Sequence, residues 1–496
     1  MITYTLADPP RIRADGGLVL IGGPCPKCAE EARLAGAPRQ VRLGGLIAPA
    51  FRPLVDVLRE HEDTVIAIRT DLAVVSTHNV RCAQNYQPPT ETEVPVERNQ
   101  LRTENELTTV DNLRAAVVDF RHGPVKGLYR SGDLPLATVT AELVDHAAGH
   151  GRTETFEQAE RVALFEAIER YNGMRPRKHQ PTTEASFAEL GPEKALDPAR
   201  LALNDEDQRY TPDLRIRWVE GWSYSRKRPL LVPEQVAYWG AETPPEQRFL
   251  HETSNGCGLG NSLTEAVLHG LFEVAERDAF LMAWYGRTPL TRIQPPPDPL
   301  LLHHSDRLEE LGYELLFLDA TNDLRIPAVL TLARTGRDDL PRAFFAAGAS
   351  PDPLAAMRSA AAEVVVDVEA FRAPEKDLKE LLDDPYEVQS MEDHVAVNTL
   401  PEAAPRYAFL VSDEDPKPLQ DNRNHTDLKK LLDSYAQNIE VIAVDQSDPH
   451  TANTLGLHSA KVIVPGTLPM TFGHRLRRTR VPRLPRVLNP HPHPFP

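Results

Sequence analysis

Two short segments of the chain carry the same arrangement of acidic and basic residues. Residues 164–170 read LFEAIER and residues 271–277 read LFEVAER, so five of seven positions are identical at a spacing of 107. The charged positions are Glu166, Glu169 and Arg170 in the first segment and Glu273, Glu276 and Arg277 in the second. Carboxylates that lie close together repel one another unless they share a cation, and Mg²⁺ takes carboxylate and phosphate oxygens as ligands. The pattern therefore predicts an acidic site that holds nucleotide phosphates through Mg²⁺, with the two arginines as orienting charges.

Both segments are expected to lie on helices that start in the same way. The spacing of 107 also relates two capping pairs, Thr155 with Gln158 and Ser262 with Glu265. Each pair has the form of a capping box, which begins a helix. On the second helix, at about 100° per residue, one side gathers Glu265, His269, Glu273 and Glu276. A solvated helix face would also be acidic, but a surface face has no reason to recur as Glu-x-x-Glu-Arg, so the repeat favours the site.

A glycine-rich segment, NGCGLGN at residues 255–261, precedes the second helix. Glycines before a helix start let backbone N–H groups approach a phosphate, although a turn that only packs tightly has the same composition. Cys257 in this segment is interpreted as a small residue in a tight loop, since no His/Asp arrangement supports a nucleophile. The P-loop pattern GxxxxGK[ST] does not occur in the sequence.

At this point the residues resemble a known family. Residues 155–171 and 254–280 closely resemble the two helical signatures of the YcaO family, and further similarity lies at 112–128, 444–474 and 489–496. The resemblance implies an ATP-binding fold unrelated to P-loop proteins, in which clustered glutamates bind Mg²⁺ and the triphosphate. It assigns metal and nucleotide ligands to Glu166, Glu169, Asn261, Glu265, Glu273 and Glu276.

The sequence departs from the family pattern in two places. The family usually carries Arg-x-x-x-Glu on a later helix; here Glu363 matches, but Ser359 stands at the arginine position and Arg358 lies one residue away. The family's first signature often opens with Gly-Lys-Gly, and this chain has His150 between two glycines. His150 or Arg152 would then replace the lysine.

The elements that must position these residues indicate an α+β fold. Residues 439–445 and 460–466 are predicted as buried strands and residues 354–372 as a helix, without regular strand–helix alternation. We expect a YcaO-type domain at 106–489 with a duplicated helix-bearing substructure. A small amino-terminal domain at 1–105 precedes it and ends in a linker at 87–100, and a proline-rich tail follows at 490–496.

The amino-terminal domain contains a cysteine pair with zinc-ligand spacing. Cys25 and Cys28 form a Cys-x-x-Cys half-site, and Cys82 and His78 are the nearest candidates to complete it. This region resembles a shortened form of the cysteine-bearing segment of E1-like proteins that accompany or fuse to these enzymes. Structural zinc and free thiols are both open interpretations.

Composition excludes several classes of partner. Among 496 residues, 55 are Lys or Arg and 72 are Asp or Glu, giving a formal charge of −17, which argues against broad nucleic-acid or anionic-membrane surfaces. No apolar run is long enough to span a membrane, and no signal peptide is recognised. Four cysteines do not form a disulfide framework, so the cytoplasm is the expected compartment.

The family resemblance implies a reaction and a role for the tail. It implies ATP-dependent cyclodehydration of Cys, Ser or Thr in a ribosomal precursor peptide, with an E1-like or leader-binding partner and a homodimer expected. The alternating prolines Pro492, Pro494 and Pro496 are specific to the azoline-forming branch, and the terminal carboxylate would act as or position a base; a disordered end is the alternative. Thioamide or amidine formation and a non-catalytic scaffold are the alternative functions.

Overall fold

The structure, a computed structural model, describes most of the chain from residue 87 onward and five short strands before it. The described residues are 2–4, 12–15, 18–22, 64–69, 74–79, 87–118, 124–132, 136–144, 147–176, 180–206, 209–421 and 423–495. The five early strands are β1 (Ile2–Tyr4), β2 (Ile12–Asp15), β3 (Leu18–Gly22), β4 (Thr64–Arg69) and β5 (Val74–Asn79). They pair antiparallel in sequence order.

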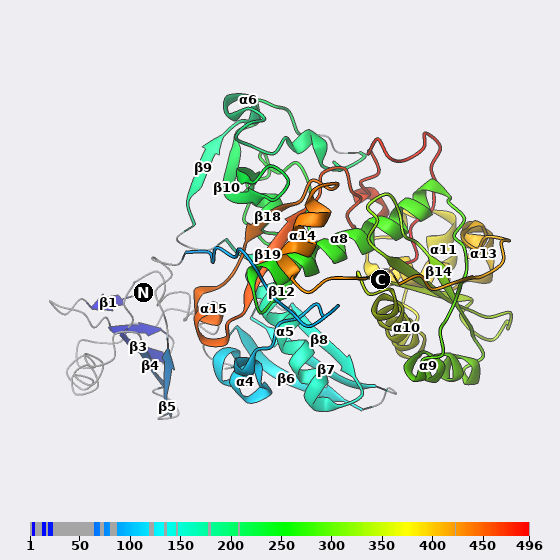
Figure 1. Ribbon diagram of the computed structural model, residues 1–496, viewed down its shortest axis with the longest axis horizontal. Helices are drawn as coiled ribbons and strands as arrows, with labels where there is room; N and C mark the ends of the chain where they lie inside the picture. Colours follow the sequence, from blue (N-terminus) through cyan, green and yellow to red (C-terminus); the bar gives the residue numbers. More distant parts are fainter. Residues whose placement is uncertain are drawn as a thin grey trace.

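A six-stranded antiparallel sheet forms the centre of the chain from residue 87 onward (Figure 1). Its strands are β9 (Thr182–Ala185), β10 (Ile216–Ser223), β11 (Arg228–Pro233), β12 (Cys257–Gly260), β18 (Ile442–Asp445) and β19 (His458–Ile463). The order is β11-β10-β18-β19-β12, with β9 beside β10, so strands distant in sequence become neighbours. The long helix α8 (Leu263–Gly286) packs on β12 and β19 at one side of this sheet.

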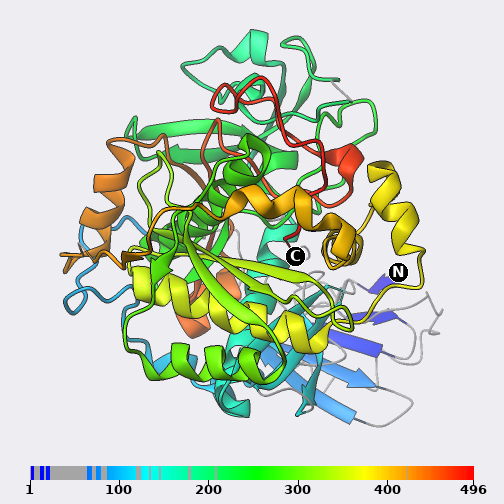
Figure 2. The same ribbon diagram turned by 90° about the vertical axis from the view of Figure 1, so that its right-hand side faces the viewer.

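Two smaller antiparallel sheets flank the centre. The first consists of β6 (Val125–Ser131), β7 (Ala137–Leu143) and β8 (Ala148–Thr153), and is covered by α4 (Val110–Val117) and α5 (Phe156–Met174). The second consists of β14 (Glu314–Asp319), β15 (Ala328–Arg334) and β16 (Ala343–Ala349). Helices α9 (Pro299–Glu310) and α10 (Pro353–Ala370) lie on one face of the second sheet and α8 packs against the other (Figure 2).

The remaining elements are short and connect these layers. They are α6 (Phe187–Leu190), α7 (Glu234–Ala237), β13 (Ile293–Gln294), α11 (Leu378–Asp383), α12 (Met391–Asn398), α13 (Ala404–Tyr407), β17 (Lys417–Pro418), α14 (Leu428–Ala436) and α15 (Pro449–Leu455), with 3-10 turns including η7 (His474–Leu476). Helices α11, α12 and α13 gather at the same end of the molecule as β14–β16 (Figure 1). Among the described residues, no helix is long and apolar enough to cross a membrane.

The duplicated substructure is visible in the packing of α5 and α8. Each helix follows a glycine-bearing strand, β8 or β12, after a gap of two residues. A Cβ on Gly151 would lie 1.7 Å from the Ala159 carbonyl oxygen, and one on Gly258 would lie 2.2 Å from that of Ala266. These glycines and carbonyls correspond at the spacing of 107, so both strands approach the backbone of their helix in the same way. Only glycine permits this approach.

The α+β class and the main elements predicted from the sequence are confirmed. Helix α10 spans nearly all of the predicted helix at 354–372, β18 falls within the predicted strand at 439–445, and β19 overlaps the one predicted at 460–466 but starts two residues earlier. Thr155 and Ser262 cap α5 and α8 as expected, each accepting a backbone N–H three residues on. Glu265 does not complete a reciprocal capping box at the start of α8. Its carboxylate instead accepts hydrogen bonds from Thr103.

The segment at 87–100, predicted as a linker, packs on the rest of the chain. Val94 is buried, and Leu428 at the start of α14 donates its backbone N–H to the Val94 carbonyl. Glu91 accepts the backbone N–H groups of Leu263 and Thr264, at 3.0 and 2.7 Å. A carboxylate is favourable at a helix N-terminus, so this segment helps to begin α8. The domain boundaries themselves stay predictions.

Replacing Gly258 by Ala is expected to lower the free energy of unfolding by at least about 2 kcal/mol, because the new methyl group meets backbone atoms that cannot move without displacing α8. Gly336→Ala is the matched control, since a Cβ there meets nothing within 4 Å. Denaturant unfolding of both variants measures the difference. Equal stability of the two variants would contradict a tight strand–helix contact.

Candidate active site

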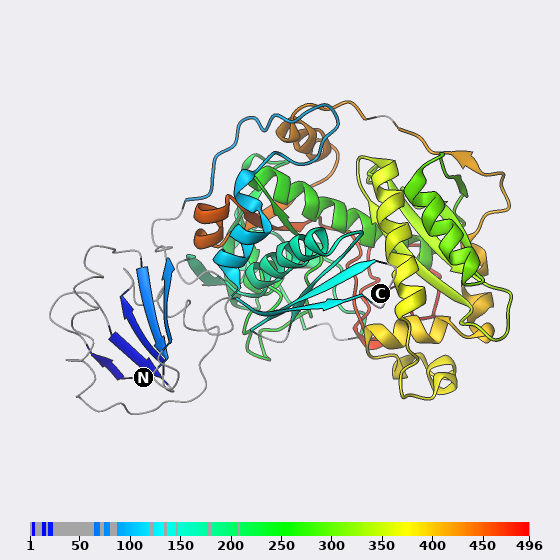
Figure 3. The same ribbon diagram turned by 90° about the horizontal axis from the view of Figure 1, so that it is seen from below.

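The four glutamates of the repeat lie on facing parts of two helices. Glu166 and Glu169 come from α5, and Glu273 and Glu276 come from α8 (the helices are seen from below in Figure 3). The pKa of Glu169 is raised to about 8 by burial and by the neighbouring negative charges of Glu273 and Glu166. The structure therefore brings together, from two helices, carboxylates that destabilise one another's charge.

A backbone N–H group and an arginine one turn further along contact the first glutamate of each pair, more closely on α5 than on α8. The backbone N–H of His150 donates to Glu166 Oε2 at 2.5 Å, and that of Gly256 donates to Glu273 Oε2 at 2.8 Å. Arg170 lies 2.6 Å from Glu166, one turn along α5. These contacts orient the carboxylates without neutralising the cluster.

On α8, Arg277 sits between its two glutamates. Its Nε lies 3.5 Å from Glu276 Oε1 and 3.9 Å from Glu273 Oε1. Even so, the pKa of Glu276 is raised to about 8, because burial and the charges of Glu363 and Glu273 outweigh Arg277. Burial likewise raises the pKa of Glu273.

Helix α10 adds a further acidic pair, one member of which the sequence did not reveal. Glu363, a predicted ligand, faces Glu276 closely enough to raise its pKa. Asp367, one turn further along α10, was not predicted; burial and Glu363 raise its pKa to about 8, while Arg152 of β8 opposes the shift. Arg152 therefore does face the cluster, as its proposed replacement of a lysine requires.

Arg358 lies apart from this cluster. Its guanidinium binds the carboxylate of Asp298, the residue that caps α9, with Nε 3.2 Å from Oδ1. The pKa of Asp298 is lowered by this hydrogen bond. The structure thus assigns Arg358 a partner at the start of α9, and its predicted role in nucleotide binding has no support from its position.

The start of α8 forms one wall of a cavity of about 330 Å³. Glu166 and Glu169 line the cavity from α5, and Asn261, Glu265 and His269 line it from the start of α8. Arg102, which the sequence did not single out, lines it from the segment before residue 105. The cavity carries charges of both signs, one arginine and several carboxylates, and this mixture suits a nucleotide.

Two predicted ligands in this cavity bind the segment at 102–105. Asn261 donates to the Thr103 carbonyl at 2.7 Å and accepts from Asn105 at 3.1 Å. Glu265 accepts both the backbone N–H and the hydroxyl of Thr103, at 3.1 and 3.2 Å. The segment therefore completes the cavity wall.

The glycine-rich segment is a strand packed on α8. Gly260 and Gly258 belong to β12, and a Cβ on either would clash with backbone atoms of Ala266. A backbone hydrogen bond from Leu259 to Glu169 lowers the pKa of that carboxyl and so offsets part of the rise that burial and the neighbouring charges cause. Cys257 is buried, and burial raises the pKa of its thiol, which is the opposite of an activated nucleophile. Tight packing is thus the observed role.

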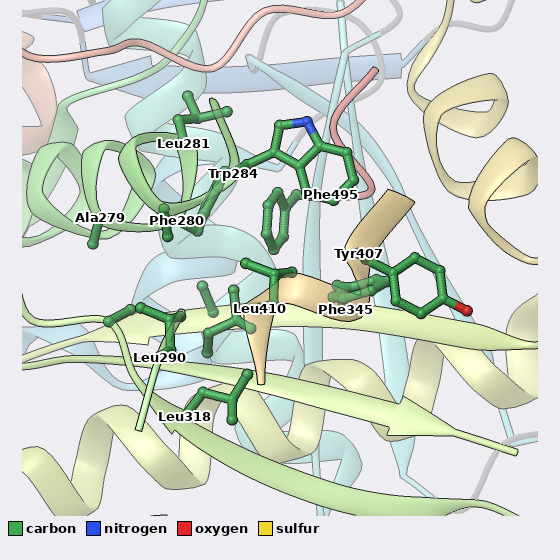
Figure 4. Close-up of a cluster of buried hydrophobic side chains, with 14 of the residues drawn as sticks. Ala279, Phe280, Leu281, Trp284, Leu290, Leu318, Phe345, Tyr407, Leu410 and Phe495 are labelled. Carbon is green, nitrogen blue, oxygen red and sulfur yellow. The ribbon is translucent and has the colours of Figure 1, made fainter. Parts of the chain in front are cut away.

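The proline-rich tail docks along the second half of α8 as far as the described chain extends. Trp284 Nε1 donates to the His491 carbonyl at 3.0 Å, and the Phe495 ring centroid lies 3.8 Å from that of Phe280 (Figure 4). The guanidinium group of Arg277 lies over the ring of Phe280, 5.9 Å from its centroid. Phe495 is 1% exposed. The tail therefore runs towards the acidic cluster, with Pro492 and Pro494 in this run and Pro496 beyond the described residues.

The acidic cluster has the donor chemistry for Mg²⁺. Its carboxylates are oxygen ligands, and the pKa values of Glu169, Glu273 and Glu276 are raised, so a shared cation would favour their charged forms. Within the described ranges, no three His, Cys, Asp or Glu side chains are already arranged to hold a metal ion. The predicted zinc ligands Cys25, Cys28 and Cys82 lie outside the described residues, and the His78 side chain is not described either.

A second, larger cavity of about 700 Å³ lies away from the predicted site. It is lined by the edge of β14–β15 and by residues 417–425, and includes Arg292 and Tyr435. None of the predicted ligands borders it. Chemistry, and not size, therefore identifies the smaller cavity as the candidate site.

Comparisons with known proteins identify a matching family and several similar solved structures. A family model described as YcaO cyclodehydratase, ATP- and Mg²⁺-binding, matches residues 150–468. A heterocyclase solved in complex with substrate and cofactor is similar at a TM-score of 0.72 and 22% identity, covering 98% of this chain and 77% of that one. A YcaO protein from Methanopyrus kandleri bound with AMPPCP and Mg²⁺ is similar at 0.53 and 21%, covering 73% and 90%.

Two further similarities are more distant or partial. The Escherichia coli microcin synthetase complex McbBCD with pro-MccB17 bound has a TM-score of 0.53 and 16% identity, covering 74% of this chain and 99% of that one. An uncharacterized protein of Methanothermobacter thermautotrophicus is 29% identical over 192 residues, or 38% of this chain and 47% of the relative. The match thus spans about half the length of that relative.

Glu169→Gln and Glu276→Gln are expected to stabilise the chain without ligands and to weaken Mg²⁺·ATP binding. A carboxyl whose pKa is 4.5 when unfolded and about 8 when folded destabilises the fold progressively as pH rises between those values. The gain in unfolding free energy should therefore be present at pH 8, at about 1 kcal/mol or more, and vanish towards pH 4.5. Binding should weaken by about 1 kcal/mol or more per ligand lost.

Denaturant unfolding at two pH values and calorimetric titration with Mg²⁺·ATP measure the two effects. Glu157→Gln, on the exposed side of α5, is the matched control and should change neither. Wild-type nucleotide affinity in both cluster variants would remove these residues from the site.

Proposed function

Because the chain belongs to the YcaO family, we propose that it is an ATP-dependent cyclodehydratase that forms thiazoline or (methyl)oxazoline rings at Cys, Ser or Thr residues of a ribosomal precursor peptide. One observation carries the proposal: α8 holds Glu273 and Glu276 of the acidic cluster and also contacts the proline-rich tail through Phe280 and Trp284. The proposed phosphate-binding groups and the described part of the tail thus lie along a single helix.

The acidic cluster and the adjoining cavity would hold the nucleotide. The magnesium ligands in this proposal are Glu166, Glu169, Glu273 and Glu276, with Glu363 beside them. Asn261 and Glu265 would contact the nucleotide, and Arg170 and Arg277 would orient phosphates. Bound Mg²⁺ would neutralise phosphate charge and so favour phosphoryl transfer. The protein's own contribution is mainly positioning and electrostatic stabilisation.

The proposed reaction removes one water from the peptide. The substrate thiol or hydroxyl loses its proton to a base and adds to the preceding amide carbonyl, whose oxygen then carries the negative charge. That oxygen takes the γ-phosphoryl group of ATP and releases ADP. Loss of phosphate, with the amide N–H proton, forms the C=N bond of the azoline. An amide oxygen is a poor leaving group without phosphorylation, which explains the need for ATP.

The tail is proposed to supply or position the base. Proline fixes φ near −65°, so alternating prolines favour an extended strand that loses little entropy on docking. The observed burial of His493 and Phe495 supports an ordered tail over a disordered end. Such a strand would deliver the carboxylate of Pro496 to a fixed point near Arg277.

Two alternatives remain distinct from this proposal. A scaffold that only binds peptide would have no reason to retain mutually repelling glutamates on both helices. Thioamide or amidine formation would use the same nucleotide site but has no evident use for a docked proline-rich tail. The ordered tail is therefore the feature that favours azoline formation.

We also propose how the chain is assisted. The microcin synthetase complex holds a precursor peptide together with several proteins, which supports a peptide substrate and an E1-like or leader-binding partner for this chain. Structural zinc at Cys25, Cys28, Cys82 and His78, a homodimer and a cytoplasmic location are retained as proposals based on the sequence alone.

Adding two glycines after Pro496 is expected to reduce ring formation at least tenfold while leaving Mg²⁺·ATP affinity within about twofold. The addition moves the terminal carboxylate but keeps Phe495, whose removal by truncation would itself cost about 3 kcal/mol of stability. Loss of water from the peptide, followed by mass spectrometry, measures ring formation. Two glycines inserted before residue 87 serve as the control, and full activity of the extended tail would exclude a catalytic terminus.

Ring formation is expected to be slow for the isolated chain and much faster with a leader-binding partner, because the similar microcin synthetase was solved as a complex of several proteins with pro-MccB17 bound. Mass spectrometry with and without the E1-like protein compares the two rates. Equal rates would show that this chain recognises its substrate unaided.

A further inference from the structure

The docked tail is held by a histidine from a distant helix. His394 lies on α12, and its Nδ1 is 2.8 Å from the carbonyl oxygen of His493. The two imidazole rings stack with centroids 4.1 Å apart. Each of these residues is 1% exposed. This contact joins two residues that are 99 positions apart in the sequence, and it fixes both the position and the orientation of the tail.

The hydrogen bonds of His394 define its protonation state. The backbone N–H of Gly473 donates to Nε2 at 3.1 Å, so Nε2 must be an unprotonated acceptor. Nδ1 therefore carries the proton and donates it to the His493 carbonyl. The side chain is neutral and both of its nitrogens are used, which makes it a bridge between the tail and the segment before η7.

Other contacts fix the two ends of this bridge. Asp393 accepts the backbone N–H groups of Gln389 and Ser390 and an ion pair from Lys376 at 2.6 Å, so the start of α12 is anchored. On the tail, His493 Nε2 lies 2.9 Å from the carbonyl oxygen of Thr471. The bridge thus connects two fixed points and has little freedom to shift.

We propose that His394 is a positioning residue, which sets the register of the tail so that its terminus reaches the acidic cluster. The inference rests on the proposed function of the tail. From His493 to the terminus are three residues, which in an extended proline-rich strand span about 9 Å. A slip of one residue at His493 would therefore move the terminus by about 3 Å, far beyond the tolerance of a reacting group.

The neutral state of His394 makes the bridge sensitive to acid. A second proton on His394 would convert Nε2 from an acceptor into an N–H donor. It would then face the N–H of Gly473 and lose that hydrogen bond. The charged or titratable groups that face His394 are Asp393, on its own helix, His474 of η7 and His493 of the tail. Burial lowers the pKa of His394 to about 4 and outweighs Asp393.

The sign of the pH effect follows from this shift. A released histidine binds a proton near its ordinary pKa of 6.5, whereas the docked one resists until about pH 4. The docked tail is therefore fully favoured above pH 6.5. Below that value, release becomes more favourable by about tenfold per pH unit for each histidine that it frees, His394 and also His493, whose pKa burial lowers as well.

The test compares His394→Leu, His394→Asn and His304→Leu in the full-length chain with its partner and peptide. Asparagine places an amide N–H close to the position of Nδ1 but does not titrate. His304 on α9 is an equally buried histidine, 2% exposed, away from the tail. Ring formation at saturating Mg²⁺·ATP, nucleotide affinity, thermal stability and hydrogen exchange of the tail amides at His491, His493 and Phe495 are measured from pH 5 to 8.

His394→Leu should reduce ring formation at least tenfold and speed exchange of the tail amides, with nucleotide affinity within twofold. His394→Asn should recover most of the ring-forming activity at pH 8 and should make the fall in activity below pH 6.5 less steep. Wild-type ring formation and tail exchange in His394→Leu, or an equal loss in His304→Leu, would overturn the inference. If His394→Leu loosens the tail but the wild-type chain forms no rings with any peptide, the proposed function fails while the role of His394 in docking stands.

Discussion

Electrostatic repulsion among the clustered carboxylates is the constraint around which the chain is built. Glu169 and Glu276 face other negative charges in a partly buried place, and water cannot screen them as it does on a surface. If all of them were ionised, such a cluster would push α5 and α8 apart, and the pKa values of about 8 for Glu169 and Glu276 reflect this cost together with that of burial. Glycine-mediated contacts of β8 and β12 with these helices, together with Arg277, hold the geometry in the absence of a cation. The clustered carboxylates thereby lower the stability of the fold locally, but they are already in position to bind a cation and phosphates.

Helix α8 connects this constraint to the rest of the molecule. Its start borders the cavity, its middle carries Glu273 and Glu276, and its end seats the tail. Because one rigid element carries all three, their spacing does not depend on loop conformations. The central sheet, the β14–β16 sheet and α14 all pack on this helix, which explains why so much of the chain is needed for a small site.

The sequence predicted the parts of the site that are local and periodic. Helix caps at Thr155 and Ser262 and the acidic side of α8 follow from spacing alone, and the structure reproduces them. Contacts between distant segments carry no such signal. Asp367 joins the cluster because it lies one turn from Glu363 on α10 and within the electrostatic reach of Arg152. Arg358 lies apart from it because a shift of one residue turns a helical side chain by about 100°. His394 lies on a short helix whose pattern gives no hint of the tail it contacts.

The segment at 87–105 changes how the chain can be divided. A composition rich in proline and polar residues made it resemble a passive connector, yet Glu91 contacts the start of α8 and Arg102 lines the cavity. A recombinant fragment that began at residue 106 would therefore lack part of the pocket wall, and it would also lack the Glu91 carboxylate that accepts two backbone N–H groups at the start of α8. By the same contacts, any shift of the segment at 87–105 would reach both the start of α8 and the wall of the pocket.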